Sequence, residues 1–244
     1  MRVSTARRLA RLFAGCALAA AGPSWADGLN VSPVVIEIDS PRKAVAITIT
    51  NDSNRAATFQ ADTFLWRQVD GVDQYEPDDD LMVVPAIVDV PPNGSQVFRV
   101  MLRTPTASPV ERTYRVMLED ISSEVARVEG SGLSFRFKHN LPVLIAPSVK
   151  VVNSMQWRAC TSAPRAGEAC VRLRNSGNRR IKIDTITVGG EGWSQSLSVQ
   201  PQLNVLAGAE REWRLPLAGR SGKLSAVKVR TAQGETLSAS QGDR

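Results

Sequence analysis

The chain has 244 residues, a formal net charge of +6 and a single histidine. This length suits one large domain or two ordinary ones, and moderate aromatic and charged contents are typical of a folded chain. The usual acid–base and nucleophile constellations are missing, and no serine stands in a G-x-S-x-G context, so we expect no enzyme, no cofactor and no metal site.

Residues 1–26 have the three-part pattern of a secretory signal peptide. A short apolar run, Leu12–Gly22, precedes the small-residue cleavage pattern of Ser24–Ala26. The run is too short to cross a membrane, so we expect general secretory export and cleavage after Ala26. A twin-arginine signal is not completed, and Cys16 lies too close to the preceding arginine for a lipoprotein cleavage box. The basic residues of this segment are Arg2, Arg7, Arg8 and Arg11.

Removal of the signal peptide changes the meaning of the charge. The segment carries four arginines and no acidic residue, so the mature chain has a net charge near 6 − 4 = +2. No block of lysine and arginine remains to indicate a nucleic-acid partner. We therefore expect neither nucleic-acid binding nor stable membrane insertion.

The first part of the mature chain, residues 27–147, predicts an Ig-like β-sandwich. Short apolar segments alternate with turn signals, and the number and spacing of strands match that fold. An acidic loop, Glu76–Asp80, could bind a cation, but its contiguous aspartates lack the spacing of a calcium loop and favour a solvated surface. The expected strands are 29–38, 44–51, 57–66, 81–90, 95–103, 113–121 and 133–145.

The last of these segments combines two patterns. Leu133, Phe135 and Phe137 alternate with polar residues, and a nearly continuous apolar run, Leu141–Ala146, follows. The alternating half either lines the domain's own core or presents an apolar face to a partner. An exposed strand of this kind is an aggregation hazard, so a protein that keeps one is expected to use it for β-augmentation.

After Pro147 the strand pattern restarts and predicts a second, smaller sandwich over residues 148–244. Cys160 and Cys170 flank a loop between two expected strands, and an exported chain favours a disulfide there over two buried thiols. The polar tail after Arg230 is expected to fray. The expected strands are 149–152, 156–160, 170–175, 179–188, 193–199, 211–217 and 223–230.

These segments together resemble the periplasmic pilus-assembly chaperones of the chaperone–usher type, and the details are similar to their archaic, spore-coat-like branch. The resemblance covers essentially the whole mature chain and rests on several segments at once. They are "NVSPVVIEI", "AVAITITNDSNRAATFQADTFLW", "VVPAIVDVPPNGSQVFRVML", "TYRVMLEDI", "LSFRFKHNLPVLIAP" and "WRAC…CVRLRNSGNRRIKI".

The resemblance implies two Ig-like domains set at an angle with a cleft between them, and a non-enzymatic mechanism without a cofactor. A pilin subunit lacks its last strand, and the chaperone would fill the open groove with Leu133, Phe135 and Phe137. It would then deliver the folded subunit to an outer-membrane usher. Free molecules are expected to cap themselves as homodimers, because an exposed strand edge invites pairing.

The resemblance also assigns charged residues. Arg99 and Asp120 match positions that help hold the two domains at a fixed angle. The family anchors the subunit's C-terminal carboxylate with an arginine and a lysine, but Val35 and Pro142 stand at the aligned places. Another cation near the cleft must replace them if anchoring persists. The candidates are Lys138, Arg136, Arg103 and Arg115.

Two other classes compete with a chaperone. An exported Ig-like adhesive or ligand-binding module would show aromatic residues in its loops, whereas most tryptophans here stand in expected strands. A pilin subunit would be one incomplete domain with an N-terminal extension, whereas this chain predicts two complete domains.

Overall fold

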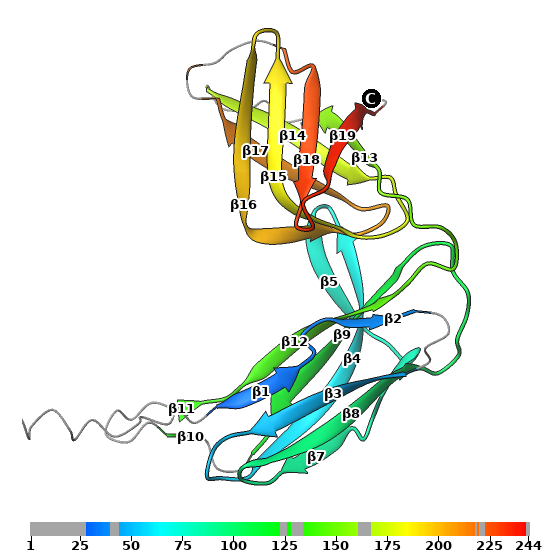
Figure 1. Ribbon diagram of the computed structural model, residues 1–244, viewed down its shortest axis with the longest axis vertical. Coiled ribbons are helices and arrows are strands. Elements are labelled where there is room, and N and C mark those ends of the chain that lie inside the picture. Colours follow the sequence, from blue (N-terminus) through cyan, green and yellow to red (C-terminus); the bar gives the residue numbers. More distant parts are fainter. Residues whose placement is uncertain are drawn as a thin grey trace, which may run out of the picture.

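The structure is a computed structural model that describes residues 28–39, 44–122, 126–127, 134–160, 167–217, 219 and 223–242. The predicted signal peptide and Leu133 lie outside these ranges. In the described ranges all regular elements are β-strands, and they form two domains, as predicted (Figure 1). No helix in this part of the chain is long and apolar enough to cross a membrane.

The first domain packs two sheets around one apolar core. Alternate residues of each strand face inward, as Ile47 and Ile49 of one sheet and Val116 and Leu118 of the other show. Burial of each such side chain contributes about 1.5–3 kcal/mol. One sheet has the order β1 (Leu29–Ser32), β3 (Ala44–Asn51), β8 (Gly94–Leu102) and β6 (Leu81–Val84). The other has the order β2 (Ile36–Ile38), β12 (Lys138–Ile145), β9 (Arg112–Asp120), β4 (Ala57–Val69) and β5 (Val72–Pro77), with β7 (Ile87–Val90) also on β4.

Prolines divide two segments that the sequence predicts as single strands. Residues 29–38 form β1 and β2, which lie in different sheets on either side of Pro33. Residues 81–90 form β6 and β7, which are separated in the same way at Pro85. Proline has no N–H to donate to a ladder, so each strand ends there and its continuation pairs elsewhere.

The hairpin of β4 and β5 is a feature that the predicted elements did not include. Its turn is Asp70–Gly71, with φ values of 50° and 77°, which is the Asp-Gly signal of a tight hairpin. β4 is longer than predicted and ends at Val69, so the hairpin extends from the first domain to the second (Figure 1). This hairpin supplies much of the junction between the domains.

The second domain is one continuous path of seven strands. The predicted tail does not fray: β19 pairs with β18 on one side and with β13 on the other. Residues 149–152, predicted as a strand, form no regular element, and three exposed valines lie there. The order is β16 (Trp193–Val205), β15 (Ile181–Gly190), β18 (Ala226–Thr231), β19 (Thr236–Gln241), β13 (Met155–Ala159), β14 (Glu168–Asn175) and β17 (Glu210–Pro216).

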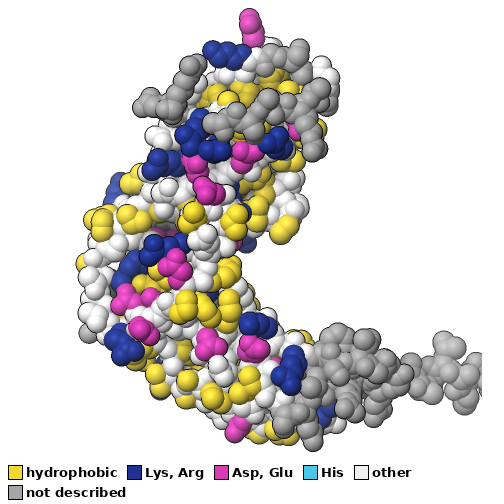
Figure 2. Space-filling model, turned by 180° about the vertical axis from the view of Figure 1, so that it is seen from behind, with side chains coloured by type: hydrophobic (Ala, Val, Ile, Leu, Met, Phe, Trp, Pro, Cys, Tyr) yellow, Lys and Arg dark blue, Asp and Glu magenta, His cyan; other side chains and the backbone are white. Residues whose placement is uncertain are grey.

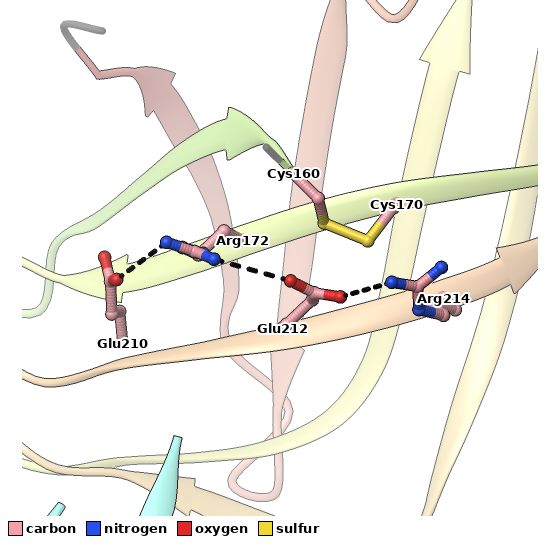
Figure 3. Close-up of a disulfide and its surroundings, with 6 residues drawn as sticks. All are labelled: Cys160, Cys170, Arg172, Glu210, Glu212 and Arg214. Carbon is pink, nitrogen blue, oxygen red and sulfur yellow. Dashed lines mark hydrogen bonds and ion pairs between the residues drawn. A yellow bond between two sulfur atoms is a disulfide. The ribbon is translucent and has the colours of Figure 1, made fainter. Parts of the chain in front are cut away.

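The predicted disulfide is confirmed. Cys160 follows β13 and Cys170 lies in β14, so their bond joins two neighbouring antiparallel strands (Figure 3). Beside it, a ladder of alternating charges crosses β14 and β17, in which Arg172 contacts both Glu210 and Glu212. The bond uses both thiols, so the grouping of Cys160, Cys170 and Glu212 offers no metal site.

Candidate functional site: an open strand edge beside the interdomain cleft

β12 has two halves with different neighbours. β9 pairs with all of it, from Lys138 to Ile145. β2 pairs with the opposite edge, but only from Val143 to Ile145. The edge from Lys138 to Pro142 therefore has no strand partner among the described residues, and it can accept one.

The hydrogen bonds show which backbone groups face this open edge. The Asp120 N–H donates to the Phe137 carbonyl at 2.9 Å, so odd-numbered residues direct their backbone groups at β9. The Ala146 N–H donates to the Ile38 carbonyl at 2.9 Å on the opposite edge. Even-numbered residues therefore direct their N–H and carbonyl groups away from β9. No second strand among the described residues pairs with those of Lys138 and Asn140, and the Asn140 carbonyl accepts only a long hydrogen bond from the Arg115 guanidinium, at 3.5 Å.

The side chains of β12 explain the two sequence patterns. Leu141, Val143 and Ile145 face the first domain's core and are buried. Phe137 continues the same face beyond the core; it is 39% exposed and its ring stacks on that of His139 with centroids 6.3 Å apart. Partial burial lowers the pKa of His139 and so favours its neutral form.

The apolar run is continuous because the second domain covers the other face of β12. Leu144 points away from the first core and is buried with Trp66 and Leu206 in a small cluster at the junction. Both faces of β12 are thus apolar near the junction, whereas only one is apolar toward Phe137. The Phe135 backbone lies in β11 (Ser134–Phe135), which pairs with β10 (Ala126–Arg127), but its side chain is outside what the structure describes.

A cleft of about 590 Å³ lies between the domains next to the open edge, on the hollowed side of the molecule (Figure 2). Val35 and Pro142, which the resemblance aligns with the family's carboxylate anchors, line it from the first domain. Two cations, Arg180 and Lys182, line it from the second domain and were not among the predicted residues. The other lining residues are Pro33, Glu37, Val45, Asn204 and Gln233.

A sequence profile of the family described as "Pili and flagellar-assembly chaperone, PapD N-terminal domain" matches residues 28–150, half of the chain. The chain belongs to this family. The chaperone is therefore not a member of an enzyme family, and the predicted adhesive and pilin alternatives give way to a pilus-assembly chaperone. No curated protein matches it.

Solved structures share the fold over both domains. The chaperone is similar to a CsuC–CsuE chaperone–tip adhesion subunit complex from archaic chaperone–usher Csu pili of Acinetobacter baumannii, with 14% identity, a TM-score of 0.67 and coverage of 88% of this chain and 100% of that one. It is also similar to the Escherichia coli chaperone DraB, with 16% identity, a TM-score of 0.57 and coverage of 88% and 97%. The Pseudomonas aeruginosa CupB2 chaperone matches with 16% identity, a TM-score of 0.54 and coverage of 87% and 100%.

The four cations predicted as carboxylate anchors do not line this cleft in the part of the chaperone that the structure describes. Lys138 forms a salt bridge with Glu119 at 2.8 Å, and Arg136 is exposed. Arg103 donates to the Asp79 carbonyl at 3.0 Å. The remaining candidate, Arg115, lies over the Trp66 ring at 3.7 Å, and burial lowers its pKa.

The two residues predicted to fix the domain angle make no contact across the junction that the described residues show. Asp120 is buried at the end of β9, where its carboxylate accepts hydrogen bonds from the Ser122 N–H and hydroxyl at 2.9 and 2.5 Å. Arg99 is exposed on β8. Their role in domain orientation stays a prediction, and the described contacts across the junction come from other residues.

Those contacts form two groups. At the hairpin, the Gln68 amide donates to the Asn204 carbonyl and accepts from the Leu206 N–H, at 3.0 and 2.9 Å, and Asp73 pairs with Arg211 at 2.5 Å.

At the cleft, Glu37 pairs with Arg180 at 3.0 Å and with Arg179 at 3.3 Å. The buried Glu111 accepts the Arg180 N–H at 2.9 Å; burial raises its pKa, although this bond and the two arginines oppose the rise. The two domains are thus joined both at the hairpin and at the cleft, and the sequence offered only the Asp-Gly turn as a signal for the hairpin contacts.

Proposed function

We propose that the protein is an exported periplasmic chaperone that captures pilus subunits by strand donation and passes them to an outer-membrane usher. The observation that carries this proposal is the open edge of β12 beside Phe137. The backbone groups of Lys138 and Asn140 supply a partner strand with hydrogen bonds, and the exposed apolar face supplies burial. Relatives solved in complex with a tip adhesion subunit or a pilin support this type of partner.

The donated residues in this proposal are Leu133, Phe135 and Phe137. Each contributes about 1.5–3 kcal/mol if a subunit's groove buries it fully. Periplasmic location rests on the family, on a relative described as a periplasmic chaperone, and on the predicted signal peptide. The similarity to the Csu complex supports the archaic branch, and self-capping of the free chaperone follows from the same open edge.

The experiment is co-expression with the secreted subunits encoded beside its gene, followed by purification from the periplasm. A stable one-to-one complex is expected, and Phe137→Asp or Phe135→Asp should abolish it while the chaperone stays folded. Val97→Asp is the matched control, because Val97 is 41% exposed, like Phe137, but lies on β8 of the other sheet. Capture by Phe137→Asp and Phe135→Asp at the parent level would refute strand donation.

We also propose that Lys182, supported by Arg180, is the cleft cation that receives the subunit's C-terminal carboxylate. The open edge of β12 leads to Pro142, which lines the same cleft as Lys182. Arg180 is already paired with Glu37, whereas Lys182 has no ion pair within the described residues. A charge-assisted bond to a carboxylate is stronger than a neutral one, so this cation can fix the end of an incoming strand.

Substitution tests this assignment. Lys182→Gln should weaken subunit capture about tenfold, the effect of roughly one charge-assisted hydrogen bond. Lys228→Gln is the matched control, because Lys228 is an exposed lysine of the adjacent strand β18 and does not line the cleft. Equal capture by both variants would show that Lys182 is not the carboxylate anchor. Lys138, Arg136, Arg103 and Arg115 would then remain the candidates.

A further inference from the structure

The pairing of β2 with β12 stops next to Pro142. Its parallel pairing with β12 matches Ile36 with Val143 and Ile38 with Ile145, and it goes no further. On the amino-terminal side of Ile36 the chain bends at Val34 and Val35, whose side chains are 62% and 42% exposed. β2 therefore leaves β12 beside the open edge.

The backbone of Pro142 accounts for this ending. Even-numbered residues of β12 direct their backbone groups toward β2, so residue 142 would supply the next N–H of the β2 ladder. Proline has no N–H, and the ladder cannot continue past it. Odd-numbered positions face β9 instead, so a proline at 142 interrupts the edge without removing a bond between β12 and β9.

We infer that Pro142 is a positioning residue that sets the carboxyl-terminal limit of the donor edge. It stops β2 from pairing with Lys138–Asn140. It also confines an incoming strand to the part of the edge that precedes residue 142. An incoming apolar strand can use the backbone groups of Lys138 and the N–H of Asn140, but it meets no N–H at residue 142, whose carbonyl already faces the Ile36 N–H in the β2 ladder. This inference rests on the proposed strand donation only for the identity of the incoming strand.

The limit has a consequence for register. The period of a strand is two, so shifting a partner by one residue turns its side chains to the wrong face. A fixed end of the hydrogen-bonding edge prevents the partner from sliding toward the junction. Pro142 therefore contributes to register through a missing donor, while the apolar face that includes Phe137 contributes to affinity.

The first test needs no subunit. In the free Pro142→Ala variant, residue 142 gains an N–H that faces the open edge. We expect the chaperone's own strand to extend, so that the new amide at position 142 and the Val34 amide exchange with solvent about tenfold more slowly than an unprotected amide. Hydrogen exchange of the ¹⁵N-labelled protein by NMR measures this, with Pro142→Val as a second variant. Free exchange at residue 142 in both variants would overturn the inference.

The second test uses whichever secreted subunit co-purifies with the parent chaperone. Asn140→Pro moves the missing donor two residues along the same edge, so the chaperone should fold but capture that subunit at least tenfold less well. Asn140→Ala is the matched control and should capture normally. Normal capture by Asn140→Pro would show that the donor edge does not include residue 140 and would overturn the proposed limits. If the parent captures no subunit, strand donation fails, but hydrogen exchange still decides the role of Pro142.

Discussion

The two domains finish their sheets in different ways. In the second domain β19 pairs with strands on both sides, so seven strands form an unbroken path, and a disulfide joins β13 to β14. In the first domain the sheets stay separate, and β2 covers only the last residues of β12. The comparison shows that similar short strands can either complete a sheet or leave an edge for another chain, depending on where pairing stops.

The two domains therefore have different roles in the chaperone. The open edge lies in the first domain, and the second domain holds that edge beside a cleft through the contacts around Trp66. A partner strand meets a rigid template only if both domains keep their places. Variants that disturb one domain and spare the other can therefore test the division.

The largest expected effect compares Val143 of β12 with Phe137, which precedes β12 and continues the same face. Val143 is fully buried in the first core, so Val143→Asp places an unpaired charge there and should cost more than about 4 kcal/mol. Phe137→Asp should change stability little, because its side chain already reaches solvent. Thermal unfolding by circular dichroism measures both. A large loss of stability in Phe137→Asp would mean that residue 137 belongs to the core and not to the donated face.

The next effect concerns the junction. Trp66 is buried against Leu144 and Leu206 and carries Arg115 on its ring, so Trp66→Ala should cost about 3 kcal/mol and loosen the domains. Small-angle X-ray scattering should show a wider distribution of shapes, and calorimetry should separate two transitions. Trp213→Ala is the control, because Trp213 lies in the second core; it should lower only the second domain's transition. An unchanged shape distribution in Trp66→Ala would contradict the role given to the junction.

The sequence predicts the strands better than their partners. Inward alternation as in Ile47 and Ile49 identifies most strands, because each strand must bury one face. The division at Pro33 between two sheets is not readable in the same way, since it depends on which edges the folded domain leaves free. The cleft cations Arg180 and Lys182 were missed because they lie far along the chain from Pro142, and only the domain arrangement brings them together.

The disulfide should matter for the second domain alone. It closes a loop with a sequence separation of 10, so replacing both cysteines by alanine should cost about 2–3 kcal/mol. The first domain and subunit capture should be unaffected, because the bond lies in β13–β14 and away from the open edge. Calorimetry with and without reductant measures the first effect, and periplasmic co-purification measures the second. A loss of capture at a temperature where both domains stay folded would show that the two domains do not divide the work in this way.

The smallest effect depends on pH and belongs to the first domain. Tyr114 is buried, its hydroxyl donates to Asp80 at 3.3 Å, and burial raises its pKa from 10.0 to about 12. A folded-state pKa above the unfolded value means that the neutral form stabilises the fold below pH 10, and that this stability is lost as the pH rises from 10 to 12.

Tyr114→Phe should therefore cost about 1 kcal/mol at neutral pH through the lost hydrogen bond and weaken the alkaline loss of stability in that pH range. Denaturant unfolding of parent and variant at pH 8 and pH 11 measures the difference. Both tyrosines of the chain lie in the first domain, so the second domain's unfolding should change equally with pH in parent and variant. A constant gap between the two proteins at both pH values would show that Tyr114 does not titrate with folding, and that its hydroxyl acts only as a hydrogen-bond donor.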